Sequence, residues 1–396
     1  MADDNQSSRI LWSGTISIYM RVRKMNENKV LIVVNSFTQN NGVTNCMMNY
    51  YDELVTHSSC VDFLVLKKVN SPYEKKVVKN GGKVFFLPKV DSYISRKKMR
   101  FLDEIMKQRY DVVHVNVPNH NGAAVLLSAY KNKVPVRVYH SHAQKLADTY
   151  KNKIKSFVFD NLCSTLSNAH LACSTVAGNE IFGIGNFKIL PNGIHAEKYV
   201  FSMENRNQIR EALGLTKAIV VGVVGRMSYL KNPFFSIKVF AEFQKLVPNA
   251  RLLWLGAGEL DEPVKELAKE LEVEDKCLFM GSVGDVEKWY SAMDILLFPS
   301  KMEGLGMVAV EAQTSGLFCI ASDQVPEDTK LTENIRYYSL NDTPAEWAKK
   351  MLDEQANWKK PRISHLDEIS EAGYNIDSSK ITLVTLYDSF LNAVHR

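Results

Sequence analysis

Short apolar runs alternate with amphipathic stretches along most of the chain, in two successive series. The first series begins with Val30–Val34, a β-branched run that is apolar on both faces, as in a strand buried within a parallel sheet. Helical spacing between the runs predicts a parallel sheet with helices on both sides. Further strands are predicted at 61–66, 83–87, 111–115, 135–139 and 169–173, and helices at about 47–54, 98–109, 121–131 and 151–168.

The second series begins with the apolar run at 218–224 and repeats the same alternation. Two α/β domains are therefore expected, each a Rossmann-like, doubly wound parallel sheet, rather than one giant sheet. A polar stretch, Lys198–Glu211, is the expected linker. Strands are predicted at 251–255, 276–280, 294–298 and 318–321, and helices at about 233–247, 260–272, 285–292 and 306–315. The expected domains are 29–200 and 201–377, with a disordered N-terminal extension at 1–28 and a final helix at 378–396.

The composition excludes several classes of protein. With 396 residues and 45% apolar content, the chain has an ordinary globular composition and is long enough for two cores. No apolar run approaches the roughly 20 residues of a membrane span, and a signal-peptide pattern is lacking. The six cysteines are scattered without C-x-x-C spacing, which is typical of free thiols in a reducing compartment. We expect a cytoplasmic protein.

Charge is distributed unevenly between the two halves of the chain. Residues 1–200 hold 27 Lys/Arg and 15 Asp/Glu, a net charge of +12, whereas residues 201–396 hold 22 and 29, a net charge of −7. The densest basic segment, Lys131–Lys155, has seven Lys/Arg and one acid, and apolar residues follow at helical spacing: Ile154, Phe157, Val158, Leu162 and Leu166. Two interpretations of the predicted helix at 151–168 stay open. Either its apolar side faces the core and its basic side is solvated, or the helix contacts an anionic membrane surface. Aromatic residues that could stack on bases are not interleaved with the charges, so nucleic acid is not an expected partner.

A first candidate site follows the strand at 218–224. Gly225 turns the chain, and Arg226 and Lys231 follow five residues apart. In doubly wound sheets, ligands bind beyond the carboxyl ends of strands. Because the Arg fork can chelate phosphate and Lys adds a mobile charge, a phosphate site is predicted; the alternative is a solvated loop.

A second candidate site follows the strand at 294–298. Gly304 and Gly306 open a helix, whose free N–H groups can bind an anion. Glu303 precedes this helix and could engage sugar hydroxyls, whereas Glu311 lies within an apolar helix face and needs partners such as two ribose hydroxyls. The alternative is an exposed Glu311 on a surface helix.

Other motifs argue against common cofactors. The dinucleotide fingerprint Gly-x-Gly-x-x-Gly is absent, because Asp261 takes the place of the third glycine after Gly256 and Gly258. His140 and His142 follow the strand at 135–139, and a histidine at the carboxyl end of a strand can donate a hydrogen bond or shuttle a proton. Neither a third metal ligand near them nor an Asp-x-Asp pair is visible, so no metal is expected; the other histidines are assigned structural roles.

Together these motifs resemble the retaining glycosyltransferases of the GT-B fold, glycosyltransferase family 4. Gly225, Arg226 and Lys231 match the family's G-R-x(4)-K element, and Glu303 to Glu311 matches its E-x(7)-E motif. Gly316–Ile320 matches its G-x-P-x-[IV] element, except that Phe318 replaces the proline. The N-terminal half resembles bacterial exopolysaccharide and capsule enzymes at Met48–Tyr51, Tyr139–His142 and Leu190–Ile194, and the resemblance covers about residues 29–390.

The resemblance implies a role for each matching residue. Arg226 and Lys231 would hold the donor's diphosphate, and Glu311 would bind the ribose hydroxyls. Glu303 and the backbone of Gly304, Leu305, Gly306 and Met307 would bind the donor sugar and phosphate. Gly42 would let the N-terminal loop approach the diphosphate, and His140 would lie near the donor sugar. The family usually has Gly-Gly in that loop, whereas this chain has Asn41-Gly42; asparagine tolerates left-handed backbone better than most residues.

The resemblance also implies an activity. It is the metal-independent transfer of a hexosyl or N-acetylhexosaminyl group from a nucleotide sugar, expected to be a UDP-sugar, to a glycan or polyprenyl-diphosphate-linked acceptor, in exopolysaccharide or capsule biosynthesis. The enzyme would need no cofactor and could act as a peripheral protein at the inner face of the plasma membrane. Two alternatives stay open: a GT-B nucleotide-sugar epimerase or phosphorylase, and a non-catalytic partner subunit that binds a sugar nucleotide.

Overall fold

The computed structural model describes residues 28–38, 42–88, 95–142 and 150–394. The expected N-terminal extension and Asn41 therefore lie outside the described residues, apart from Asn28. The described residues form two compact units. The first contains the residues up to His140, those of 147–171 and those from Lys380 onward, and the second contains Ser141, His142 and Ala172–Ser379.

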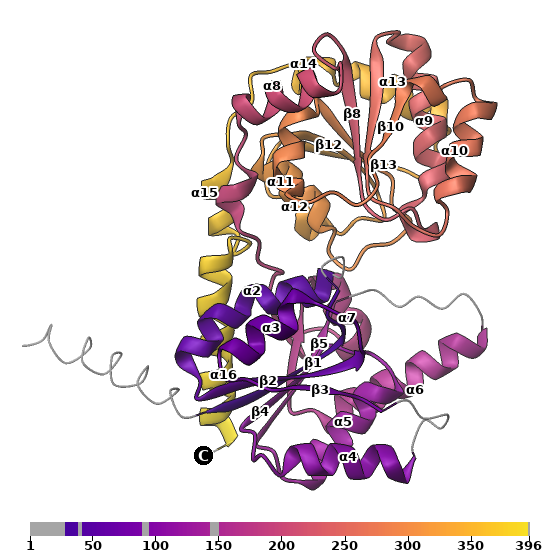
Figure 1. The fold of residues 1–396 in the computed structure, drawn as a ribbon. Coiled ribbons are helices and arrows are strands. Elements are labelled where there is room, and N and C mark those ends of the chain that lie inside the picture. Colours follow the sequence, from indigo (N-terminus) through magenta and orange to yellow (C-terminus); the bar gives the residue numbers. More distant parts are fainter. Residues whose placement is uncertain (1–27, 39–41, 89–94, 143–149, 395–396) are drawn as a thin grey trace, which may run out of the picture. The chain divides into compact units, whose positions relative to one another are not determined.

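Seven strands of the described chain form the first sheet, in the order β3-β2-β1-β4-β5-β6-β7 (Figure 1). β1 lies between β2 and β4 and pairs with both in parallel, with Val30 opposite Val61 and Val112. The strands are β1 (Lys29–Ser36), β2 (Cys60–Lys67), β3 (Val84–Phe86), β4 (Val112–Val115), β5 (Val136–Ser141), β6 (Ala169–Ala172) and β7 (Lys188–Ile189).

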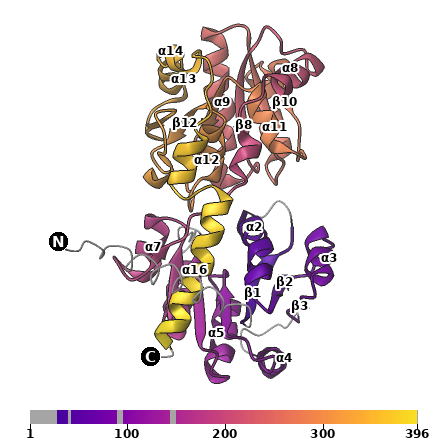
Figure 2. The same cartoon turned by 90° about the vertical axis from the view of Figure 1, so that its left-hand side faces the viewer.

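Helices connect these strands, and several begin at side-chain caps. Ser71, Ser95 and Asn119 accept hydrogen bonds from backbone N–H groups at the starts of α3, α4 and α5. The final helix, α16, lies against the first sheet (Figure 2). The hydroxyl of Tyr387 on this helix lies 2.5 Å from Nδ1 of His114 on β4. The helices are α2 (Gly42–His57), α3 (Pro72–Lys79), α4 (Arg96–Met106), α5 (His120–Lys131), α6 (Tyr150–Leu166), α7 (Thr175–Phe182) and α16 (Ile376–Val394).

Six strands of the described chain form the second sheet, in the order β10-β9-β8-β11-β12-β13. The order reverses between β8 and β11, so the loops that follow these two strands meet at the topological switch point, where open α/β sheets bind ligands. The strands are β8 (Ile219–Val224), β9 (Ala250–Leu255), β10 (Cys277–Phe279), β11 (Ile295–Phe298), β12 (Phe318–Ser322) and β13 (Ile335–Tyr338).

Two buried cores lie on opposite faces of the second sheet. One contains Ile237 of α9 and Trp347 of α13. The other contains Ala309 of α12, and Tyr290 from the 3₁₀ turn η5. Figure 1 shows α9 and α10 on one side of this sheet and α11 and α12 on the other. The helices are α8 (Met203–Ala212), α9 (Pro233–Leu246), α10 (Asp261–Glu270), α11 (Val286–Trp289), α12 (Met307–Thr314), α13 (Pro344–Asp353), α14 (Gln355–Trp358) and α15 (Leu366–Glu371). Short 3₁₀ turns are η2 (Ala196–Tyr199), η3 (Tyr229–Lys231), η4 (Glu274–Lys276), η5 (Tyr290–Ala292) and η6 (Glu327–Thr329).

The fold class predicted from the sequence is confirmed: both sheets are parallel, doubly wound and Rossmann-like. Every predicted strand is present to within two residues. β7 and β13 were not predicted. β7 has only two residues, both exposed, and β13 has a single fully buried residue, Ile335, so neither shows the apolar run of a buried strand.

The polar stretch Lys198–Glu211, which was predicted as the linker, forms part of η2 and most of α8 and lies within the second unit. Arg206 and Arg210 both bind Asp294, with N–O distances of 2.5 and 3.0 Å. They also donate to backbone carbonyl groups at the end of η5 and just after it, those of Ala292 and Met293 among them. These guanidinium groups fix α8 to the second unit, and they compensate the partial negative charge at a helical C-terminus.

Candidate functional site

The loops that follow β8 and β11 bring a predicted cation and a predicted carboxylate together. Lys231 ends η3, and its Nζ lies 2.5 Å from Oε1 of Glu303. The backbone N–H of Lys301 donates to the carbonyl oxygen of Leu230 at 2.8 Å, which joins the two loops. The Lys231 ammonium also lies over the ring of Phe298, 5.4 Å from its centroid. Lys231 is thus fixed at the switch point.

Arg226 lies in the same loop but in different surroundings. It follows Gly225, whose φ of +144° is in the region that favours glycine. The Arg226 side chain is exposed, and no hydrogen bond or ion pair of its guanidinium occurs among the described residues. A planar fork with five donors at this position can receive a phosphate group.

Gly256 and Gly258 have a packing role that their spacing in the sequence does not indicate. A Cβ atom on Gly256 would lie 2.1 Å from the carbonyl oxygen of Gly225, and one on Gly258 would lie 2.3 Å from that of Met227. The N–H of Leu260 also donates to Met227 at 3.1 Å. This glycine pair therefore lets the loop after β9 pack directly on the backbone of the Arg226 loop.

The segment from Gly304 to Met307 is held at the start of α12. Gly306, with φ of +91°, is the N-cap, and the helix begins at Met307, so first-turn N–H groups lack intrahelical acceptors. The Gly304 carbonyl accepts a hydrogen bond from Oγ of Ser174 at 2.7 Å. Leu305 is buried in an apolar cluster with Val310. This part of the predicted site is fixed by both hydrogen bonds and packing.

Glu311 lies on α12 with two phenols as partners. The hydroxyl of Tyr290 donates to Oε2 at 2.5 Å, and the nearby phenol of Tyr199 also lowers the pKa of this carboxyl group. Burial raises the pKa of Glu311 to about 7, against the lowering effects of both phenols and of Lys231. The alternative of an exposed Glu311 is wrong. The two tyrosines were missed, since nothing in their spacing along the chain relates them to Glu311.

The remaining predicted site residues, His140 and Gly42, belong to the first unit. His140 is the penultimate residue of β5 and is 1% exposed. Its Nδ1 lies 3.1 Å from Nε2 of His114, whose Nδ1 is 2.5 Å from the hydroxyl of Tyr387. This buried series of hydrogen-bonded side chains gives His114 a polar role that the sequence analysis did not recognise. Gly42 begins α2 in open space, where a Cβ would meet no atom within 4 Å. Burial lowers the pKa of His142 to about 4, which favours a neutral, hydrogen-bonding imidazole.

The apolar stripe of α6 is exposed and does not face the core, contrary to one of the two interpretations of the sequence. Ile154, Phe157 and Val158 are 49%, 62% and 52% exposed. The inner side of the helix instead carries Asp160, whose carboxylate accepts hydrogen bonds from Tyr139 at 2.9 Å and Ser156 at 2.8 Å. A buried polar network thus takes the position that the pattern assigned to apolar side chains.

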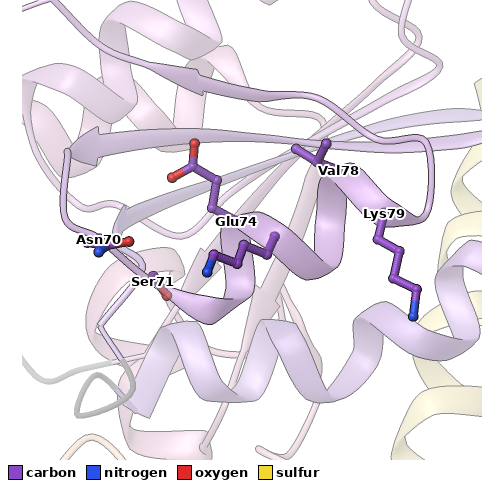
Figure 3. A pocket seen from close by; sticks show the side chains of 6 residues that line it. Asn70, Ser71, Glu74, Val78 and Lys79 are labelled. Carbon is purple, nitrogen blue, oxygen red and sulfur yellow. The ribbon is translucent and has the colours of Figure 1, made fainter.

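A surface depression also lies along α3 in the first unit. Glu74 and Lys79 on its rim point in opposite directions, and Val78 is exposed between them (Figure 3). Because the lining groups do not converge on a common point, this depression is not a candidate for catalysis. Its other lining residues are Asn70, Ser71 and Lys75.

Three findings concern metals, thiols and membranes. Across the described part of the chain, no cluster of three or more His, Cys, Asp or Glu side chains has the arrangement of a metal site. All six cysteines lie among the described residues, and no disulfide bond joins any two of them. Within the same described residues, no helix combines the length and the apolar character of a membrane span.

A family model identifies the region that holds the site. Residues 205–351 match the family described as Glycosyl transferases group 1. This group 1 region contains Arg226, Lys231, Glu303 and Glu311, together with the Gly304–Met307 segment. The two joined loops and the N-terminus of α12 therefore lie entirely within it.

Relatives and solved structures extend the likeness over more of the chain. EpsF of Bacillus subtilis is 26% identical over 91% of this chain and 97% of its own length. The Escherichia coli UDP-Gal:alpha-D-GlcNAc-diphosphoundecaprenol alpha-1,3-galactosyltransferase is 28% identical over 61% of this chain and 66% of its own. The crystal structure of Anabaena HepE in complex with UDP and glucose has a TM-score of 0.75 at 17% identity, and covers 92% of this chain and 100% of the other. This structural likeness places both units in the GT-B fold.

Proposed function

We propose that this protein is a retaining glycosyltransferase of family 4. It would transfer a hexosyl or N-acetylhexosaminyl group from a UDP-sugar to a hydroxyl of a glycan or of a polyprenyl-diphosphate-linked acceptor, in exopolysaccharide or capsule biosynthesis. The observation that carries the proposal is the meeting, at one switch point, of Lys231, the exposed Arg226 and the N-terminus of α12, with Glu303 beside them.

The donor's diphosphate fits this set of groups. An ammonium group has three donors, so Lys231 can bind a phosphate oxygen while it keeps Glu303 as a partner. Arg226 adds a planar fork, and the first turn of α12 adds N–H groups and the positive end of a helix dipole. The departing diphosphate gains negative charge in the transition state, and fixed donors that face this charge lower the barrier. In this proposal no metal ion is required.

The reaction proceeds by attack on the same face from which the leaving group departs. The acceptor oxygen forms a bond to the anomeric carbon, the bond from that carbon to the diphosphate oxygen breaks, and the acceptor proton passes to the leaving phosphate. A double displacement would need a carboxylate beside the anomeric carbon, and the sequence motifs designate none. Glu303 binds the sugar hydroxyls in this scheme, and the roles that the resemblance implies for His140 and Gly42 stay predictions.

Names of related proteins support the substrate classes. The Escherichia coli relative is named for UDP-Gal and for a diphosphoundecaprenol-linked acceptor. Anabaena HepE was crystallised with UDP and glucose. A Salmonella typhi relative, Vi polysaccharide biosynthesis protein VipC/TviE, is 30% identical over 122 residues, or 31% of this chain. These names favour a UDP-sugar and a role in the synthesis of a bacterial polysaccharide.

The exposed apolar side of α6 supports peripheral attachment to a membrane. Ile154, Phe157 and Val158 are exposed next to Lys155, within the densest basic segment of the chain. An apolar side beside lysines suits an anionic lipid surface. We therefore propose a cytoplasmic protein that binds reversibly at the inner face of the plasma membrane, where a lipid-linked acceptor would lie.

The test is a transfer assay with a panel of UDP-hexoses and UDP-N-acetylhexosamines, with glycan and polyprenyl-diphosphate-sugar acceptors. NMR spectroscopy of the product would give its anomeric configuration. Transfer with retained configuration is expected. Inverted product would overturn retention, and conversion of the donor to an epimer would establish the epimerase alternative. Binding of UDP without any turnover of donor would establish the non-catalytic alternative.

A further inference from the structure

Tyr290 is a buried residue whose only polar side-chain group points at Glu311. Its side chain is 0% exposed, and its hydroxyl lies 2.5 Å from Oε2 of the carboxylate. Tyr199, at the end of η2, lies near the same carboxyl group and lowers its pKa, and its ring packs against that of Tyr290 with centroids 5.8 Å apart. Two phenols from η2 and η5 thus converge on one carboxyl group of α12.

The charge of Glu311 is balanced by few neighbours. Besides the two phenols, the groups that act on it are the ammonium of Lys231 on η3, which favours the ionised form, and the carboxylate of Glu287 on α11, which opposes it. Three acidic side chains on other elements that pack against α12 have partners of their own. Glu197 of η2 accepts from Asn375, Asp328 of η6 accepts from Thr175, and Glu368 of α15 binds His365.

This balance leaves Glu311 close to protonation near neutral pH. Burial raises its pKa to about 7, and the phenol hydrogen bonds act in the opposite direction. An ionised carboxylate has about four acceptor positions. After the two phenols, the remaining positions match the two donors of a vicinal diol, whereas a proton on Glu311 would remove acceptor capacity.

We propose that Tyr290, supported by Tyr199, is a positioning residue for the nucleotide: its O–H group keeps the Glu311 carboxylate ionised and oriented toward the two ribose hydroxyls. This inference rests on the proposed function, in which Glu311 binds the ribose. It adds that nucleotide affinity is coupled to pH through a phenol that itself does not touch the ligand.

The test is calorimetric titration of the full chain with UDP and with 2′-deoxy-UDP between pH 6 and 9. The ratio of the two affinities isolates the ribose contact, because ionisation of the phosphates affects both ligands alike. In the wild type this ratio should fall as the pH drops through about 7, where Glu311 takes up a proton. In Glu311→Gln the ratio should be independent of pH.

Tyr290→Phe removes one oxygen atom and leaves the ring packing in place. Loss of the phenol should move the midpoint of the ratio upward by about one pH unit, so that the ratio at pH 7 falls about fivefold and recovers to the wild-type value near pH 9. Tyr199→Phe should act in the same direction. The matched control is Tyr337→Phe, whose hydroxyl lies 3.0 Å from that of Thr329 in the same unit and does not bind Glu311; it should leave the profile unchanged.

The outcomes separate this inference from the proposed function. Failure of the wild type to bind UDP at any pH would overturn the proposed function and this inference with it. A wild type that binds UDP, together with Tyr290→Phe and Tyr199→Phe profiles that coincide with the control, would overturn the positioning role alone. A loss of affinity in Tyr290→Phe that is equal at every pH would also overturn it, since this would be a purely structural effect.

Discussion

In the proposed function, Lys231 and Arg226 present a cation to the donor's phosphate in two different ways. Lys231 is partly buried, paired with Glu303 and placed over an aromatic ring, so its position is largely fixed before a ligand arrives. Arg226 is exposed, and its long side chain is not held by an ion pair among the described residues. The first is preorganised, and the second loses side-chain entropy when it binds.

We predict that Arg226→Ala and Lys231→Ala each lower kcat/KM about 10²-fold or more, as expected for loss of a donor that faces developing charge. Steady-state kinetics with the preferred UDP-sugar would measure this, and circular dichroism would verify folding. The matched control is Lys238→Ala, an exposed lysine on α9 of the same unit, which should keep full activity. Two folded variants with near wild-type activity would show that these cations do not bind the diphosphate.

We also predict that transfer activity persists after treatment with EDTA. The charge of the diphosphate is balanced in our proposal by Arg226, Lys231 and the α12 N-terminus, without an Asp-x-Asp pair for a divalent ion. The assay would compare rates before chelation, after chelation and after addition of Mg²⁺ or Mn²⁺. Loss of activity in EDTA with recovery on adding either ion would contradict the metal-independent proposal.

At the scale of single residues, the sequence predicts those parts of the site that are contiguous. Arg226, Lys231, Glu303 and the glycines that open α12 lie in two short loops, each placed by the strand before it. Tyr290 and Tyr199 reach Glu311 through packing between separate elements. Such partners depend on tertiary structure, and no local pattern encodes them.

At the scale of elements, strands were easier to predict than the faces of helices. β1 is apolar on both sides and fully buried from Val30 to Val34, so its pattern has one interpretation. The apolar stripe of α6 has two interpretations, a core-facing side and an exposed side. In the structure the stripe is exposed, because Asp160 and its hydroxyl partners occupy the inner side. α8 is polar along most of its length, and long-range ion pairs to Asp294, together with the packing of Ile209 on a buried core, attach it to the fold.

The packing of the loop after β9 on the Arg226 loop gives a prediction at this scale. In Gly258→Ala the new methyl group would lie 2.3 Å from the Met227 carbonyl oxygen, so backbone must move. Overpacking of this kind costs about 1–3 kcal/mol, and the melting temperature should fall by several degrees. Donor KM should rise as well, because the displaced loop carries Arg226.

Gly284→Ala is the matched control for this change. Gly284 lies in the same unit, and a Cβ there would meet no atom within 4 Å. Its melting temperature, measured by differential scanning calorimetry, should stay within about 1–2 °C of the wild type. Equal melting temperatures and equal donor KM for Gly258→Ala and Gly284→Ala would show that the two loops are not coupled.

At the scale of the whole molecule, the uneven charge bears on the membrane proposal. Residues 1–200 carry a net charge of +12 and residues 201–396 carry −7. An anionic bilayer attracts the first half and repels the second, and both effects decay within a Debye length of about 8 Å at physiological salt. The basic segment and the exposed side of α6 both belong to the attracted half, so they are expected to make the contact.

We predict binding to liposomes that contain phosphatidylglycerol, little binding to neutral liposomes, and release at high salt. Each basic residue near an anionic surface contributes about 1 kcal/mol, so changing Lys151, Lys153 and Lys155 to Glu should weaken binding by at least about 10²-fold. Phe157→Ser should weaken it about tenfold through lost burial of the ring.

Changing Lys238, Lys245 and Lys349 of the second half to Glu is the charge-matched control and should have little effect. Liposome co-sedimentation would measure the binding of the wild type, the two α6 variants and the control. Equal binding of the wild type to neutral and anionic vesicles, or binding to neither, would mean that the exposed side of α6 is only a solvated surface.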